Sequence, residues 1–341
     1  MLYVTTRSND APQTAHIALM ESRGADGGLY LPLRLPAFSE DEVRALREKS
    51  FSAVVAEILN LFFASRLTSW DVEFLIGRRP VRLVPMSHRI LIAETWHNPD
   101  WDFMRIVREL TTHLTGDPDS APSGWAVMAV RIAVLFGIFS GLTEESEDGG
   151  VPVDISVASG DFSGAMAARC ARQMGLPIAN IVVSCNENCA PWDLIHKGEL
   201  RTGNVAFRTA APECDHAVPE NLERFIHACG GTAAVGDYLS RGAMGGVYFP
   251  DEETLANLRQ GIHVSVISSK RILGAIPNIY KTTGKVLGPY STLAWCGLMD
   301  YRAQTGENRL SLVLSDRGAM KDAETVAAAM GLQPERLAEI L

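Results

Sequence analysis

Continuous apolar runs alternate along this chain with segments of helical periodicity. The β-branched run Val153–Ala158 predicts a strand buried on both faces, and Ile178–Ser184 predicts a second one. A glycine-bearing turn and a helix that ends at Gly175 separate the two runs. This order is typical of a parallel sheet with a crossover helix, so the pattern predicts an α/β fold with a mostly parallel sheet and helices on both faces. Further strands are expected at Arg89–Ala93, Val264–Ser268 and Leu310–Leu314.

Helices dominate the predicted structure before the first of these strands. Ser39 followed by Glu42 has the spacing of a capping box at a helix start. Phe51–Phe63 predicts a second, more apolar helix, in which Leu61, Phe62 and Phe63 form a continuous apolar end. Later helices are expected over Phe103–Leu114, over Trp125–Gly141, from Val218 to Gly230, after Ser269 and from Ser291. We therefore expect a helical segment over residues 1–80 and an α/β domain over residues 81–341.

Charge and hydropathy narrow the class of protein. The 341 residues are 47% hydrophobic and 21% charged, which is typical of a globular protein. The net charge of -9 argues against nucleic acid or an acidic membrane as a partner. The most apolar stretch, Trp125–Leu142, contains Arg131 and two glycines, so it predicts a buried helix rather than a membrane span. The first residues do not form a signal peptide, and we expect a cytoplasmic protein.

The six cysteines do not predict a metal centre. They contain no CxxC pair, and reduced, mostly buried thiols are expected. Cys185 and Cys189, with Cys214 and His216 at a distance, are the only arrangement that suggests zinc. Their spacing is not that of a structural zinc site, so we expect no metal.

Several separated segments, in a constant order, carry a resemblance to a known family. They are Tyr3–Arg7, Asp26–Tyr30, Glu94–Pro99, Ser159–Gly164, Met174–Ile178, Asn186–Asn188, Pro219–Phe225, Gly288–Thr292 and Leu314–Ser315. In this order they resemble threonine synthase over nearly the whole chain. The resemblance implies the pyridoxal-phosphate (PLP) fold type II, which is the architecture of the tryptophan synthase β subunit.

The chain departs from the family at the position of the cofactor lysine. Where the resemblance places that lysine, after Phe103, this chain has Met104. A thioether forms no imine with PLP, and a one-residue shift to Arg105 supplies no base either. We therefore expect no cofactor, although non-covalent binding of PLP stays open.

A second departure is a deletion. The resemblance implies a smaller α/β lid domain after the lysine segment, but here only a turn-rich linker near residues 115–124 leads to Trp125. The fold is therefore expected to be the larger sheet domain with the small domain missing. A lost lid exposes surfaces that it formerly covered, among them the apolar flank of Trp125–Gly141. Cover by the helix Phe51–Phe63 or by a second copy of the chain is expected, and we predict a homodimer.

The candidate site residues lie in turns that follow strands. The turn Ser159–Gly164 resembles the loop that holds the cofactor phosphate, and a glycine-bearing turn at a helix start directs N–H groups at an anion. Asp161 replaces the family's asparagine there and would repel an anion unless it faces away. Candidate anion-binding residues are Ser159, Gly160, Phe162, Ser163, Gly164, Asn186 and Asn188, and candidate acid–base residues are His97, Asp161, Tyr290 and Asp316.

Two classes of function follow from these observations. The first is a threonine synthase-like protein that has lost threonine synthesis and binds a small anionic molecule or a partner on the retained scaffold. The second is an enzyme whose acid–base chemistry needs no Schiff base. Loss of both the lysine and the lid favours the first.

Overall fold

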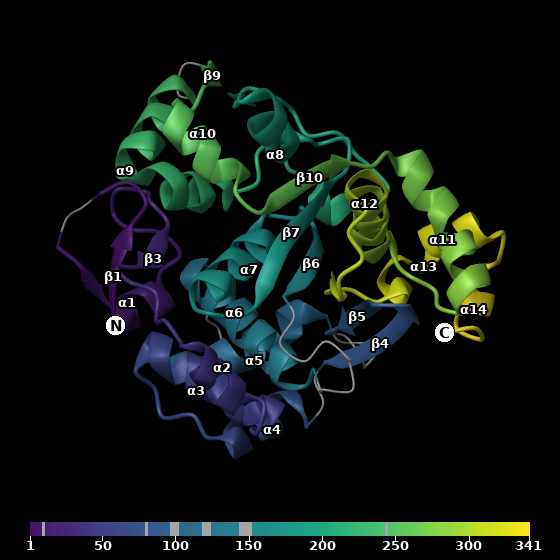
Figure 1. The fold of residues 1–341 in the computed structure, drawn as a ribbon, viewed down its shortest axis with the longest axis horizontal. Helices are drawn as coiled ribbons and strands as arrows, with labels where there is room; N and C mark the ends of the chain where they lie inside the picture. Colours follow the sequence, from purple (N-terminus) through teal and green to yellow (C-terminus); the bar gives the residue numbers. More distant parts are fainter. Residues whose placement is uncertain (9–10, 79–80, 96–101, 118–123, 143–151, 243–244) are drawn as a thin grey trace.

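A six-stranded sheet forms the centre of the computed structural model, which describes all residues except 9–10, 79–80, 96–101, 118–123, 143–151 and 243–244. Its strands are β4 (Arg82–Ser87), β5 (Ile90–Glu94), β6 (Val153–Ala158), β7 (Ile178–Cys185), β10 (Ile262–Val266) and β11 (Ser311–Ser315). Their order is β10-β7-β6-β11-β5-β4 (Figure 1). Only β4 runs antiparallel to its neighbour, so the predicted α/β fold with a mostly parallel sheet is confirmed.

Helices surround this sheet on both faces. They are α1 (Ala15–Met20), α2 (Glu40–Leu46), α3 (Phe51–Phe63), α4 (Ser69–Ile76), α5 (Phe103–Thr115), α6 (Gly124–Ser140), α7 (Ser163–Gln173), α8 (Ala190–Trp192), α9 (Leu222–Gly242), α10 (Glu252–Arg259), α11 (Ser269–Thr283), α12 (Pro289–Thr305), α13 (Ala323–Met330) and α14 (Pro334–Leu337). Successive strand residues face opposite sides: Leu312 belongs to the core on the α7 side, and Val313 to the core on the α12 side. This double burial explains why the strands are continuous apolar runs.

The N-terminal residues contain a small sheet that the sequence patterns predict only in part, since the turn Asp26–Pro32 indicates a short extended segment there. Strands β1 (Leu2–Thr5), β2 (Gln13–Thr14) and β3 (Tyr30–Pro32) form an antiparallel sheet in the order β2-β1-β3. Each strand has at most four residues, too few to show a clear alternation of apolar and polar positions. The description of residues 1–80 as helical is therefore incomplete.

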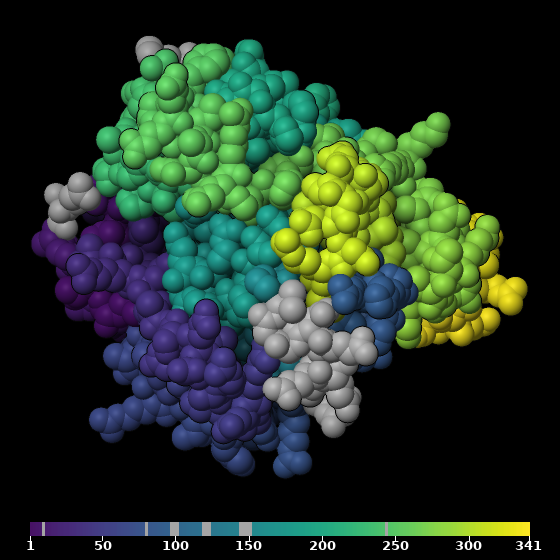
Figure 2. Space-filling view, viewed as in Figure 1, coloured from purple at the N-terminus to yellow at the C-terminus, as the bar shows by residue number. Residues whose placement is uncertain are grey.

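The N-terminal helices cover the apolar helix α6. Trp125 of α6 is 1% exposed and lies in edge-to-face contact with Phe62 of α3, with ring centroids 5.6 Å apart. Tyr3 of β1 contacts the same indole and donates a hydrogen bond to the Phe62 carbonyl. In Figure 2 the purple surface of the N-terminal residues adjoins the teal surface of residues from the middle of the chain. Of the two predicted covers for α6, the structure therefore contains the one within the chain.

Helix ends follow local signals closely. The capping box predicted at Ser39 is present, with its hydroxyl accepting from the Glu42 amide and the Glu42 carboxylate accepting from the Ser39 amide. The helix predicted to end at Gly230 does end there: Gly231, with a non-helical φ of 69°, separates it from the second helical stretch included in α9. Among the described helices, none is long and apolar enough to cross a membrane.

Candidate functional site

A cavity of about 510 Å³ lies at the carboxyl ends of β6 and β11, which are adjacent parallel strands. Asp161 follows β6 and Asp316 follows β11, so the topology alone brings these carboxylates to one edge of the sheet. Ligands of open α/β sheets bind at this edge. The side chains that line it are Ser22, Asp102, Phe103, Met104, Val127, Met128, Arg131, Asp161, Ser163, Glu213, His216, Glu220, Asn221, Arg224, Tyr290, Asp316 and Arg317, together with Gly124 and Gly160.

An ion pair between Arg131 and Asp316 occupies the floor of this cavity. Arg131 Nη1 lies 2.6 Å from Asp316 Oδ2, and both side chains are at most 15% exposed. The guanidinium also lies over the Phe103 ring, 3.9 Å from its centroid. Arg131 is the charge inside the apolar helix predicted from the sequence, and a buried arginine in such a helix normally needs a partner.

Tyr290 stands beside this ion pair at the start of α12. Burial and the nearby Asp316 carboxylate raise the pKa of its hydroxyl well above the usual value, so the phenol stays protonated at neutral pH. A phenol in this state donates a proton or a hydrogen bond but does not act as a base. Three of the four predicted acid–base residues, Asp161, Tyr290 and Asp316, therefore line one cavity; the fourth, His97, lies outside the described residues.

Met104 faces the cavity from the first turn of α5 and is 38% exposed. Arg105, the next residue, forms an ion pair with Glu109 and does not line the cavity. The chain has six lysines, at positions 49, 197, 270, 281, 285 and 321, and all of them lie among the described residues. None of these six lysines lines the cavity in the described structure.

The turn between β6 and α7 uses most of its own donors. The Asp161 carboxylate accepts hydrogen bonds from the Ser163 amide, at 3.0 Å, and from the Ser163 hydroxyl. The Gly160 amide donates to Cys214 Sγ, and the Phe162 amide donates to the Ser159 carbonyl. A carboxylate at the helix start thus takes a hydrogen bond that a bound phosphate would need. This arrangement counts against the predicted anion site at this turn.

Only two of the predicted anion-binding residues, Gly160 and Ser163, line the cavity. Phe162 is fully buried against Phe225. Ser159 and Gly164, at the two ends of the turn, are buried as well. Asn186 and Asn188 are buried instead in contacts with the segment 207–215, where both side-chain amides donate to Asp215. These hydrogen bonds hold the segment 207–215, and neither asparagine lines the cavity.

Arg224 is a cavity residue that the sequence patterns did not single out. It lies in the first turn of α9 and is 1% exposed. Its Nε donates to the Tyr30 carbonyl and its Nη1 to Asn221 Oδ1, while Nη2 has no partner among the described residues. Burial lowers the pKa of this guanidinium to about 10, which leaves it charged at neutral pH.

Of the other charged residues in the cavity, Asp102 accepts a hydrogen bond from the Arg105 amide, and the following residues form ion pairs. Arg317 interacts with Glu213 at 2.9 Å and with Asp322 at 3.0 Å. Glu220 at the cavity edge is paired with Arg23 from the N-terminal segment. Cys214 is buried, and its pKa is raised to about 12 by that burial, so it remains a thiol. Within the described residues, no three metal-ligating side chains gather around it or elsewhere.

Known proteins share both sequence and fold with this chain. Residues 2–78 match the family model described as threonine synthase N terminus. Mouse "Threonine synthase-like 2" is 23% identical over an alignment of 451 positions, covering all of this chain and 91% of that protein. Human "Threonine synthase-like 1" is 30% identical over 149 residues, which is 42% of this chain and only 20% of that protein.

Solved structures give the same result at the level of the fold. Yeast threonine synthase superimposes with a TM-score of 0.85 at 16% identity, covering 99% of this chain and 93% of that one. PLP-bound threonine synthase from Brucella melitensis gives 0.84 at 18% identity, covering 100% and 94%. The fold is therefore that of the PLP fold type II proteins. Within that class, the chain is similar to threonine synthase-like proteins over its whole length.

Proposed function

We propose that this chain is a threonine synthase-like protein that does not make threonine and binds a small anionic molecule in the cavity at the ends of β6 and β11. One observation carries the first part: none of the six lysines, all in the described part of the chain, lines this cavity. Without an amine, PLP has no covalent anchor, and the chemistry that PLP supplies when bound, stabilisation of a carbanion, is lost.

The residues present do not fit PLP as a covalent group. Asp161 and Cys214 engage amides of the turn that resembles the phosphate-binding loop, and Met104 stands where the family lysine is expected. The length of the alignment with the mouse relative supports the same proposal. The alignment spans 451 positions, more than the 341 residues of this chain, as expected if this chain lacks a lid domain. A cavity without a lid excludes water poorly.

A test of the first part uses purified full-length protein incubated with PLP, reduced with borohydride and analysed by mass spectrometry. We expect no phosphopyridoxyl adduct at any one specific lysine and no threonine formation. The matched variant Met104→Lys returns an amine to the cavity. A specific adduct on the unchanged protein would overturn the proposal, whereas an adduct only on Met104→Lys would show that the lost anchor alone separates this cavity from a PLP site.

A second candidate function is acid–base catalysis without a Schiff base. The observation that favours it is the gathering of Asp161, Tyr290 and Asp316 around one cavity. However, Arg131 engages Asp316, and the raised pKa of Tyr290 removes it as a base. Binding therefore remains the preferred proposal, with a cytoplasmic location and a homodimer as further predictions.

A further inference from the structure

We propose that Arg224 is the residue that binds an oxyanion of the ligand, a carboxylate or a phosphate group, at the α9 end of the cavity. This inference rests on the proposed function, because it names the binding residue of the same site. It also moves the anion away from the turn Ser159–Gly164, where the sequence placed it.

The three arginines of the cavity differ in whether a carboxylate already holds them. Arg131 is paired with Asp316, and Arg317 with Glu213 and Asp322. Arg224 forms no ion pair with a described carboxylate, and its two hydrogen bonds go to a backbone carbonyl and a side-chain amide. It is therefore the one arginine of the cavity lining whose charge still lacks a bonded anion.

Burial makes this missing partner costly. Arg224 is 1% exposed, so water does not solvate the charge, and Nη2 makes no hydrogen bond in the described structure. The residue also lies in the first turn of α9, where the helix dipole disfavours a cation. An oxyanion in the adjoining cavity would satisfy Nη2 and offset both effects.

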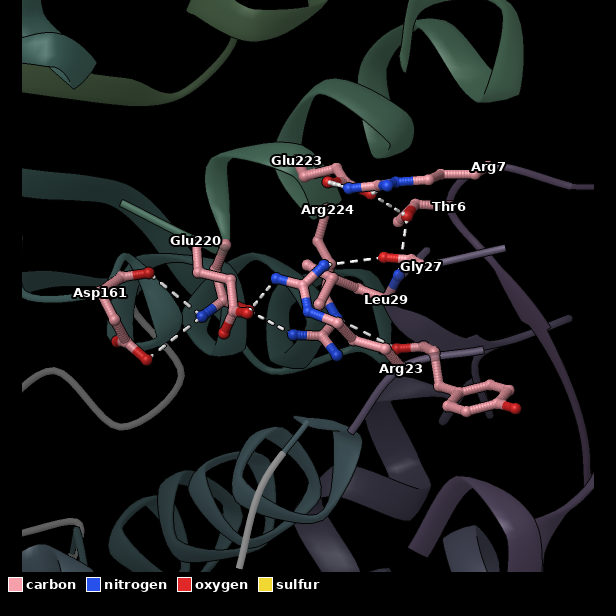
Figure 3. Close-up of polar contacts among 11 residues, drawn as sticks. Thr6, Arg7, Arg23, Gly27, Leu29, Asp161, Glu220, Glu223 and Arg224 are labelled. Atoms are coloured by element: carbon pink, nitrogen blue, oxygen red, sulfur yellow. Dashed lines mark hydrogen bonds and ion pairs between the residues drawn. The ribbon is translucent and has the colours of Figure 1, made fainter. Parts of the chain in front are cut away.

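The N-terminal segment fixes the guanidinium in this position. Tyr30 of β3 accepts from Nε, and the neighbouring Glu223 is held by Arg7 at 2.8 Å. Figure 3 shows Arg224 between the N-terminal residues and Asp161. Asn221 links Arg224 to Asp161, because its Oδ1 accepts from Arg224 and its Nδ2 donates to the Asp161 carboxylate. A guanidinium held on one side and unpaired on the other is preorganised for a ligand.

Among the nearby carboxylates, Glu220 raises the pKa of Arg224 the most, although its own ion pair is with Arg23. It is 48% exposed and lines the same cavity, so it competes with an incoming anion for the Arg224 charge. Because Nη2 itself is covered, an anion reaches it only when a lining side chain moves, and Glu220 is the exposed residue among the charged ones of the lining.

The experiment measures binding of inorganic phosphate and of acetate to the full chain by isothermal titration calorimetry at low chloride. Arg224→Lys keeps the charge but loses the unpaired Nη2, and we expect affinity to fall at least about tenfold. Glu220→Gln removes a competing charge and should raise affinity several-fold. Arg169→Lys is the matched control, since Arg169 is also buried with an unpartnered Nε but does not line the cavity.

Circular dichroism first confirms that each variant is folded. Tighter binding of phosphate than of acetate would identify the ligand group as a phosphate, and the reverse a carboxylate. If the unchanged chain binds neither anion, the proposed function fails and this inference fails with it. If the chain binds but Arg224→Lys binds equally well, or Arg169→Lys loses as much affinity, the role of Arg224 is wrong while the proposed function stands.

Discussion

Single residues decide what this cavity can do, and the sequence predicts some of them better than others. Asp161 and Asp316 were found because they follow strands, and Tyr290 because it lies in the segment Gly288–Thr292, which resembles the family. The sequence shows Arg131 only as a charge within an apolar helix. It does not predict the pairing with Asp316, which lies 185 positions away. Arg224 carried no signal, because its lack of a partner is a property of the folded chain. Spacing along a sequence does not predict such long-range pairing.

The Arg131–Asp316 pair leads to a prediction about stability. Asp316→Asn leaves a guanidinium that is only 13% exposed without its carboxylate, and breaking such pairs is costly. We expect the free energy of unfolding in urea to fall by about 2–4 kcal/mol, below the full range for buried pairs because the cavity admits water. Asp300→Asn is the control, since it breaks a pair with Arg271, which is 45% exposed, and should cost less than about 1 kcal/mol. Equal losses of stability from the two substitutions would contradict the description of Arg131–Asp316 as a buried ion pair.

At the scale of elements, long apolar segments were predicted well and short paired ones were not. Strand β6 and helix α3 have the predicted bounds, because each is a long run whose burial is encoded locally. Strand β4, which contains Pro85, was missed because it is an edge strand. The strands β1 and β2 exist through their pairing within the small sheet, which no local pattern reports.

The contact between α3 and α6 provides a test at this scale. Gly137 of α6 lies against the Phe51 ring, and a methyl group added there would lie 2.7 Å from ring carbons. We expect Gly137→Ala to lower the free energy of unfolding by about 1–2 kcal/mol, because overpacking outweighs the gain in helix propensity. Gly236→Ala, in the open surface of α9, is the matched control and should stabilise the chain by up to about 1 kcal/mol. A stabilising Gly137→Ala would mean that the two helices do not meet as described.

For the whole molecule, the burial of α6 by the N-terminal residues bears on two predictions, the division of the chain into two domains and the homodimer. The N-terminal residues and the large sheet share one hydrophobic core, which joins Tyr3 and Phe62 to Trp125. The exposed apolar flank that motivated the homodimer is thus covered within the chain. The dimer stays a prediction that light scattering tests, and the stacked, exposed rings of Trp70 and Phe74 on α4 are the apolar surface left on that side.

The shared core also predicts that residues 81–341 do not fold alone. Removing residues 1–80 uncovers α6, in which Trp125, Met128 and Ile132 are at most 1% exposed, and burying each large apolar side chain contributes about 1.5–3 kcal/mol. The truncation also removes the Tyr30 carbonyl that holds Arg224. We expect the truncated protein to aggregate or to bind a dye for exposed apolar surface, whereas the full chain does neither. Adding residues 1–80 as a separate polypeptide should restore solubility if the defect is the lost cover. A soluble, cooperatively unfolding fragment 81–341 would show instead that the N-terminal segment is a dispensable addition to an independent domain.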